Sequence, residues 1–274
     1  MDKIVLLCDN SLDGMLTAIY DGFVIKKQRF GQGAEALADV YEDNIEIRPE
    51  ENYEYEMFAA YVNVRTDRKK AEKTIDAIRK CMGEEAFYMV LRALCHYDVQ
   101  RGSDCFGFLV RGFRIGNGIC HMLTDPYVMR VMELARKAGN EAHLFLELLR
   151  FKDMGGILFG KIEPKCFVLP LIGQHFIERY PGENFIIYDE KHKFSMIHKR
   201  YGEAVFLADQ EVTFPEFPEA VCTSNQTSEV NYERLWQTYF ETIEIQERKN
   251  PRCQQNHAPL WYRKNMEEFS EKKG

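Results

Sequence analysis

The sequence predicts an α+β fold with a helical middle section and a mostly antiparallel sheet formed mainly by the second half. Apolar residues recur at helical spacing through most of residues 66–149. Beyond Arg150, short apolar runs separated by turn residues replace that pattern, which is typical of strands. The chain has 274 residues, enough to bury a substantial hydrophobic core.

The N-terminal segment alternates strand and helix patterns. The apolar run at 4–8 predicts a short buried strand, and the pattern at 12–20 predicts the helix that follows it. Two further strands are expected around 45–47 and 59–64, within or after an acidic stretch.

Three helices are predicted next, followed by a long fourth one. Thr66 or Asp67 caps the first helix, and Gly83 is expected to end it. Helical patterns follow at 84–97 and near 104–113. The longest apolar stripe begins at Asp125-Pro126, a capping acid before a proline that needs no N–H donor, and continues to residue 149.

The second half is predicted to combine strands with one internal helix. That helix spans 168–180, and an amphipathic helix at 232–246 follows a Pro-rich and polar loop at 214–228. The four expected strands lie at 156–162, 184–188, 194–198 and 204–208.

Charge is distributed unevenly along the chain. Residues 1–60 hold 5 Lys/Arg and 13 Asp/Glu, whereas 248–264 hold five basic residues and no acidic one. The total net charge of −7 argues against a basic nucleic-acid coat, so any nucleic-acid surface belongs to the C-terminal half. We therefore divide the chain into an acidic N-terminal α/β segment, 1–62, and a main α+β domain, 63–274, with a basic and aromatic tail.

Cysteine spacing and hydropathy indicate the compartment. None of the eight cysteines lies within four residues of another, so the sequence has no CxxC pair and no compact disulfide framework. No secretory leader or apolar run of membrane-spanning length is present. We expect a cytoplasmic protein without a membrane association, and no motif calls for a cofactor.

Several short motifs together resemble a bacterial family of DNA-metabolism or DNA-repair proteins of unknown activity. The resemblance begins at Asp9-Asn10-Ser11-Leu12-Asp13-Gly14 and covers nearly the whole chain. The motifs that carry it further on are Glu141-Ala142-His143, Arg150-Phe151, Ile162-Glu163-Pro164, Leu169-Pro170-Leu171, His175-Phe176, Arg179-Tyr180-Pro181, Ile187-Tyr188-Asp189, Trp236, Phe240, Glu247-Arg248-Lys249-Asn250-Pro251 and Gln254.

This resemblance implies a partner rather than a catalytic residue. Proteins of that family tend to be encoded beside a radical-SAM protein of DNA-repair type, and some carry an added uracil-DNA-glycosylase domain. The resemblance therefore implies a role in repair together with a radical-SAM partner, with any radical or glycosylase chemistry performed by another protein or domain.

Two helices carry candidate phosphate-binding residues. His143 and Arg150 share a helix face with Glu147, at i, i+7 and i+4, where they could hold a phosphate or form only a surface ion pair. On the next helix, His175 and Arg179 lie at i and i+4, and Arg179 could instead bind the last helix carbonyls.

The basic tail combines cations, amides and aromatic rings. Such a composition is typical of surfaces that contact phosphates and stack on bases, although the tail could also pack back on the core. The nucleic-acid-binding candidates in this tail are Arg248, Asn250, Gln254, Trp261 and Tyr262.

Three hypotheses for function follow. The first is a nucleic-acid-binding protein of DNA metabolism. The second is a nucleic-acid-processing enzyme, a hydrolase or glycosylase-like protein, whose general acid or base is His143, Glu163 or Asp189. Two histidines with Glu163 and Asp189 could also bind a metal, but the spacing lacks a metal-binding motif, so no metal is assigned. The third is an adaptor that docks a basic partner through the acidic N-terminal part without contacting DNA.

Overall fold

The computed structural model describes residues 3–30, 44–51, 53–208, 239, 242 and 250–266. The chain forms two compact units, Met1–Asn140 and Glu141–Gly274, and the helix α5 (Pro126–Leu148) begins in the first and ends in the second. The sequence suggested a division at 62/63 instead. Helices on either side of that point pack on each other, so residue 63 lies inside the first unit.

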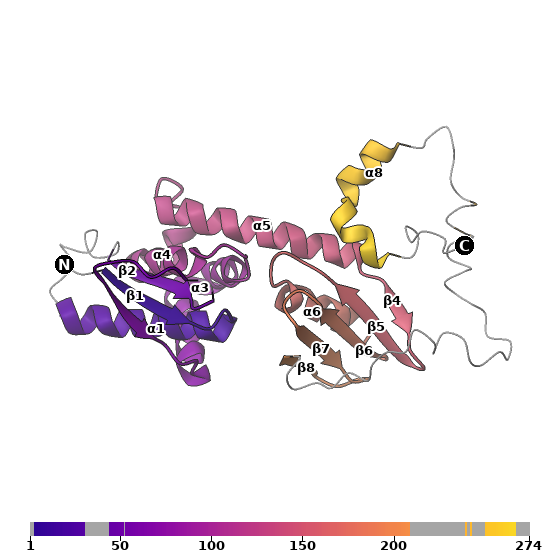
Figure 1. Ribbon diagram of the computed structural model, residues 1–274, viewed down its shortest axis with the longest axis horizontal. Helices are drawn as coiled ribbons and strands as arrows, with labels where there is room; N and C mark the ends of the chain where they lie inside the picture. The colour runs from indigo at the N-terminus through magenta and orange to yellow at the C-terminus, as the bar shows by residue number, and fades with distance from the viewer. Residues whose placement is uncertain are drawn as a thin grey trace. The chain divides into compact units, whose positions relative to one another are not determined.

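The first unit contains a three-stranded parallel sheet with strand order β2-β1-β3 (Figure 1). The central strand β1 is apolar from Ile4 to Cys8, and the neighbouring residues Val5 and Leu6, whose side chains point to opposite faces of the sheet, are both fully buried. The strands are β1 (Lys3–Cys8), β2 (Ile45–Pro49) and β3 (Ala59–Asn63).

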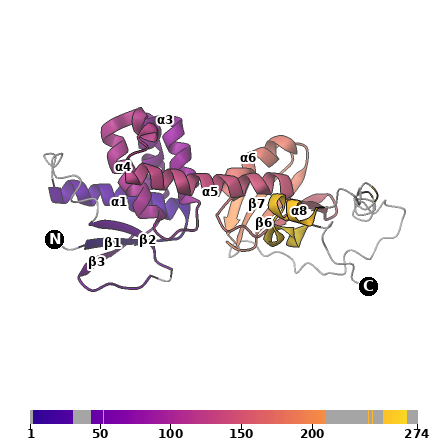
Figure 2. The ribbon, with the colours of Figure 1, turned by 90° about the horizontal axis from the view of Figure 1, so that it is seen from above.

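Helices cover one side of this sheet, as Figure 2 shows. They are α1 (Leu12–Phe30), α3 (Arg68–Leu94), α4 (Arg101–Ile115) and the 3-10 helix η2 (Gly116–His121). The predicted caps at Asp67 and Asp125 are confirmed, because each carboxylate accepts backbone N–H groups of the following turn. Gly83 (φ 84°, ψ 177°) kinks α3 at the point where the sequence predicted a helix end.

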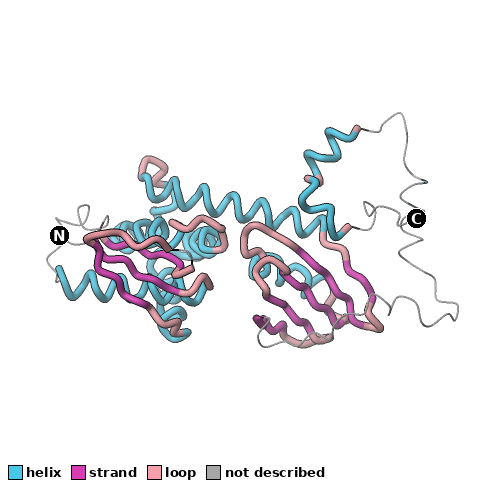
Figure 3. Tube along the Cα trace, in the orientation of Figure 1, coloured by secondary structure: helices cyan, strands magenta, loops and turns pink. Residues whose placement is uncertain are grey.

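The second unit contains a five-stranded sheet in which strand order follows chain order, β4-β5-β6-β7-β8 (Figure 3). Three neighbouring pairs are antiparallel, but β5 and β6 are parallel, so the sheet is mixed. Helix α6 (Leu169–Arg179) makes the crossover between that parallel pair. The strands are β4 (Phe151–Asp153), β5 (Ile157–Ile162), β6 (Asn184–Asp189), β7 (Phe194–His198) and β8 (Ala204–Ala208).

The C-terminal part of the second unit is helical where it is described. Helix α8 (Pro251–His257) is followed by the 3-10 helix η6 (Leu260–Asn265). The predicted loop at 214–228 and nearly all of the predicted helix at 232–246 lie outside the described residues. The α+β class predicted from the sequence is confirmed. Among the described helices, none combines the length and the apolar character needed to span a bilayer.

Candidate functional site

The parallel pair β5 and β6 places two carboxylates at neighbouring strand ends. Ile162, the last residue of β5, is in register with Asp189, the last residue of β6, and Glu163 follows directly. The carboxyl ends of parallel strands are where open α/β sheets bind their ligands. The crossover through α6 therefore brings Glu163 and Asp189, both predicted from the sequence, to the same end of the sheet.

Asp189 and His192 form a hydrogen-bonded pair at this edge. The Asp189 side chain is fully buried, and its Oδ1 accepts the backbone N–H groups of Lys191 (3.1 Å) and His192 (3.0 Å). Its Oδ2 lies 2.7 Å from His192 Nδ1, and the imidazole contacts the ring of Phe167 edge-on at 5.5 Å. Opposite an ionised carboxylate, which only accepts hydrogen bonds, Nδ1 is the donor, and Nε2 can accept a proton whenever the ring is neutral.

Glu163 anchors the tail. Its carboxylate pairs with Lys264 Nζ at 2.8 Å, and its backbone oxygen accepts the indole N–H of Trp261 at 2.9 Å. The ammonium of Lys264 also lies 4.4 Å from the centre of the Trp261 ring. The hydrogen bond from Lys264 lowers the pKa of Glu163 below its ordinary value, outweighing the opposing effect of burial.

Glu141 is a second, more deeply buried anchor for the tail. Its side-chain oxygens accept the backbone N–H groups of Lys165 and Cys166, both at 2.7 Å, and the hydroxyl of Tyr262 at 2.8 Å. Burial alone would raise the pKa of Glu141, but these hydrogen bonds outweigh it, and the pKa is lowered. The carboxylate therefore joins the end of α5, the loop after β5 and η6.

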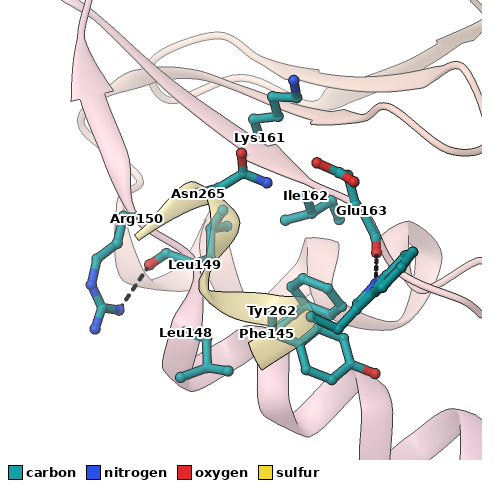
Figure 4. A pocket seen from close by; sticks show the side chains of 10 residues that line it. Phe145, Leu148, Leu149, Arg150, Lys161, Ile162, Glu163, Tyr262 and Asn265 are labelled. Carbon is teal, nitrogen blue, oxygen red and sulfur yellow. Dashed lines mark hydrogen bonds between the residues drawn. The ribbon is translucent and has the colours of Figure 1, made fainter. Parts of the chain in front are cut away.

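A pocket that Glu163 and Tyr262 help to line is shown in Figure 4. Arg150 and Lys161 supply its cations, and the side chain of Arg150 extends away from the rings of Phe145 and Tyr262. Apolar side chains, Glu163 and an amide complete the lining, which consists of Phe145, Leu148, Leu149, Arg150, Lys161, Ile162, Glu163, Trp261, Tyr262 and Asn265. Four of the residues predicted from the sequence, Arg150, Glu163, Trp261 and Tyr262, therefore meet here.

The remaining helix candidates are not part of this pocket. His143 is exposed on α5 and pairs with Glu147 at 3.3 Å, in the i, i+4 arrangement that the sequence suggested. Arg150 donates to the backbone oxygen of Glu147 at 2.8 Å rather than to its carboxylate. On α6, His175 is exposed, and Arg179 donates to the hydroxyl of Tyr180 at 3.2 Å.

The tail candidates divide into anchoring and exposed residues. Asn250 caps α8 by accepting the N–H of Cys253 at 3.0 Å, and Gln254 is exposed on the same helix. Trp261 and Tyr262 pack against the second unit through the contacts described above. Arg248 lies outside the described residues.

The sequence indicated no individual role for Glu141 or Lys264, and it placed His192 only in a basic hairpin turn. The only signal for the His192 pair was its spacing of three residues from Asp189 within a turn, and Glu141 was noticed only as part of a family motif. Within the described part of the chain, no group of three or more histidine, cysteine or acidic side chains is arranged to hold a metal ion.

The fold and site define a two-unit α+β protein whose second unit carries a carboxylate–histidine pair at a parallel strand edge and an anchored aromatic tail. A family model described as a domain of unknown function, DUF4130, matches residues 99–268, more than half of the chain. The chain therefore belongs to the DUF4130 family.

No curated protein matches the chain. One solved structure that resembles it is described as a member of the s1p family of ribosomal proteins, DHH domain. It is 11% identical, with 72% of this chain and 73% of that chain covered and a TM-score of 0.24. A likeness at this level carries no argument about function.

Proposed function

We propose that this protein acts in DNA metabolism or repair by binding nucleic acid through α8 and η6. The observation that carries the proposal is an exposed aromatic ring beside cations, on a segment fixed to the second unit by two carboxylates. Trp261 is 45% exposed although its indole N–H is already satisfied, so the free part of the ring is available for stacking on a base.

The composition of the tail supports the same proposal. Residues 250–266 include Arg252, Arg263 and Lys264 but no acidic residue. Every side chain of α8 is exposed, among them Arg252 and Gln254. Cations on such a surface would meet phosphates, and amides would hydrogen-bond to sugar or phosphate oxygens. Arg150, His175 and Arg179 remain proposed phosphate contacts.

Salt-dependent binding tests this proposal. The anisotropy of a fluorescent single-stranded oligonucleotide of about 12 nucleotides should report binding whose log K falls linearly with log salt. Arg252→Ala should reduce that slope by about 0.7 if one phosphate contact is lost. Arg68→Ala is the matched control, because Arg68 is 84% exposed on α3 of the other unit. No binding at low salt would refute the proposal.

Trp261 allows stacking to be separated from anchoring. Trp261→Phe removes the indole N–H that reaches Glu163 but keeps a ring, whereas Trp261→Leu removes both. If Trp261 stacks on a base, Trp261→Phe should retain most of the affinity and Trp261→Leu should lose about tenfold, near the lower end of base-stacking energies. Equal losses in both variants would assign Trp261 to anchoring alone.

The second element of the proposal is a radical-SAM partner. Its support is the family resemblance, which associates such proteins with a radical-SAM protein of DNA-repair type. Size-exclusion chromatography of the two purified proteins, with and without the oligonucleotide, should show co-elution. Separate elution under both conditions would remove this element and leave nucleic-acid binding untouched.

A nucleic-acid-processing reaction is the second candidate, and the Asp189–His192 pair favours it. Asp189 orients the imidazole, and Nε2 would take the proton of an attacking water. His192→Gln should then abolish turnover of the oligonucleotide without weakening its binding. His121→Ala is the control, because His121 is an exposed histidine on η2 of the first unit. Unchanged turnover in His192→Gln would exclude this mechanism.

A further inference from the structure

The crossover from β2 to β3 in the first unit presents two apolar side chains to solvent. Met57 is 83% exposed and Phe58 is 87% exposed, directly before β3 begins at Ala59. Tyr55 is 68% exposed two residues earlier. Isolated exposed apolar residues are ordinary, but three within four positions form a patch, and such patches mark interaction sites.

The backbone at Phe58 is strained. Its φ of 66° lies in the left-handed region, which is unfavourable for a bulky side chain. Strain of this kind persists only where the surrounding structure enforces it, and it clusters at functional positions. Burial of the Phe58 side chain cannot compensate here, because the ring is exposed.

Hydrogen bonds and an ion pair of Glu56, the residue before Met57, hold the crossover in place. The hydroxyl of Tyr61 donates to the backbone oxygen of Glu56 at 2.9 Å and accepts the N–H of the same residue at 2.5 Å. Lys3 Nζ pairs with the carboxylates of Glu56 at 2.7 Å and of Glu46 at 2.9 Å. Tyr55 stacks edge-on with Tyr61 at 4.8 Å. The turn that carries Met57 and Phe58 is therefore fixed by contacts of the residues just before it.

The patch continues into strand β3. In the order β2-β1-β3, this strand pairs only with β1, and its outer edge carries no partner strand among the described residues. Val62 on β3 is 40% exposed. An available edge beside apolar anchors is the arrangement that proteins use to add a strand from a partner.

The charge around this edge selects the partner. Residues 53–63, which lead into β3 and form it, hold the carboxylates of Glu54 and Glu56 and no cation. Lys3 on β1 pairs with Glu56 at 2.7 Å, whereas Glu54 takes part in no ion pair among the described residues. A negative rim repels phosphates and anionic lipid surfaces and attracts lysine or arginine side chains.

We propose that Met57, Phe58 and the outer edge of β3 form a docking surface for a protein partner that presents an extended, basic segment. The partner segment adds a strand to β3, Met57 and Phe58 enter an apolar recess on the partner, and a cation of the partner meets the carboxylate of Glu54. This surface belongs to the first unit and is independent of the nucleic-acid contacts proposed for the tail.

Site-specific photo-crosslinking in the full chain tests this surface. Benzoylphenylalanine at position 58 should form a protein adduct in cells, and mass spectrometry should locate it within a segment rich in lysine or arginine. The same group at Tyr88, which is 50% exposed on α3, is the background control. A synthetic peptide of the crosslinked segment should then protect the β3 amides from hydrogen exchange, and Glu54→Lys should abolish that protection.

A second variant serves as the control for loss of folding. Phe58→Gly relieves the left-handed strain, so its Tm should be no lower than that of the unmodified protein, yet peptide protection of β3 should disappear. Adducts to nucleic acid, adducts to a second copy of this chain, or no adduct above the Tyr88 background would each overturn the proposal. Unchanged protection in Phe58→Gly would overturn it as well.

Discussion

Tyr262 donates its hydroxyl to the carboxylate of Glu141 at 2.8 Å across 121 residues of sequence. Tyr262→Phe keeps the edge-on ring contact with Phe145 and removes the hydroxyl that makes this hydrogen bond. A hydrogen bond to a charged group contributes about 1.5–3 kcal/mol, so the free energy of unfolding should fall by about that amount. Denaturant unfolding measures it. Tyr201→Phe, at a side chain that is 75% exposed, should change nothing, and equal effects would contradict the assigned role.

Acid should weaken the attachment of the tail. The pKa values of Glu141 and Glu163 are both lowered in the folded protein, so their contribution to stability is present above the ordinary glutamate value of 4.5. It is lost as pH falls through the folded pKa values. Thermal unfolding of the unmodified protein and of Glu141→Gln should therefore differ most near neutral pH and converge as the pH falls below 4.5 and through the lowered pKa.

The matched control for that titration is Glu147→Gln. Its carboxylate is 59% exposed and pairs only with His143 among the described residues. This variant should follow the unmodified protein across the whole pH range. A constant gap between the unmodified protein and Glu141→Gln at every pH would show that lost packing, not lost charge, explains the effect.

Replacing Arg101 should destabilise the first unit. This residue is only 6% exposed, and its guanidinium donates to the backbone oxygens of Leu94 and Asp98, both at 2.9 Å, and to the side chain of Asn10. Arg101→Met leaves these buried acceptors without their donor, which should cost about 3 kcal/mol in denaturant unfolding. Arg101→Lys should recover little, because an ammonium cannot reproduce the planar fork. A loss as small as that of exposed Arg68→Ala would contradict this account.

Thiol labelling should divide the cysteines by burial. Burial raises the pKa of Cys8 and of Cys95 to about 12, so neither forms a reactive thiolate near pH 8. Cys81 and Cys253 are exposed. Alkylation of the folded protein followed by peptide mass spectrometry should modify these two and spare the buried pair. Modification of Cys95 without denaturant would contradict its burial.

Local signals predicted most of the elements because they depend on neighbouring residues. Carboxylates before the first turn marked the starts of α3 and α5, and Gly83 marked a real change of direction. The kink was not recognised as internal to α3, since a glycine at the end of a helix and one within a kinked helix have the same sequence signal.

Strand direction was harder to predict than strand position. Periodicity is the same in parallel and antiparallel strands, so the parallel sheet of the first unit was not expected. The pair β5 and β6 did carry a usable signal, because a helix separates them and a parallel pair needs a crossover of that kind.

The site depended on contacts that are distant in sequence. Glu141 lies beside an apolar stripe on α5, and it is buried because Lys165 and Cys166 fold back over it. The tail could have been a free cationic arm or packed structure, and its composition fits both. Trp261 has both properties in the structure, an anchored N–H and a partly exposed ring.

The chain-order arrangement of the second sheet has a consequence for synthesis on the ribosome. Each strand from β5 to β8 pairs with the strand made just before it, so this sheet can grow in one direction as the chain emerges. In the first sheet, by contrast, the earliest strand must wait for both partners. Once residue 208 has left the ribosome, the nascent chain should contain strands β4 to β8 paired while Glu141 still lacks the hydroxyl of Tyr262.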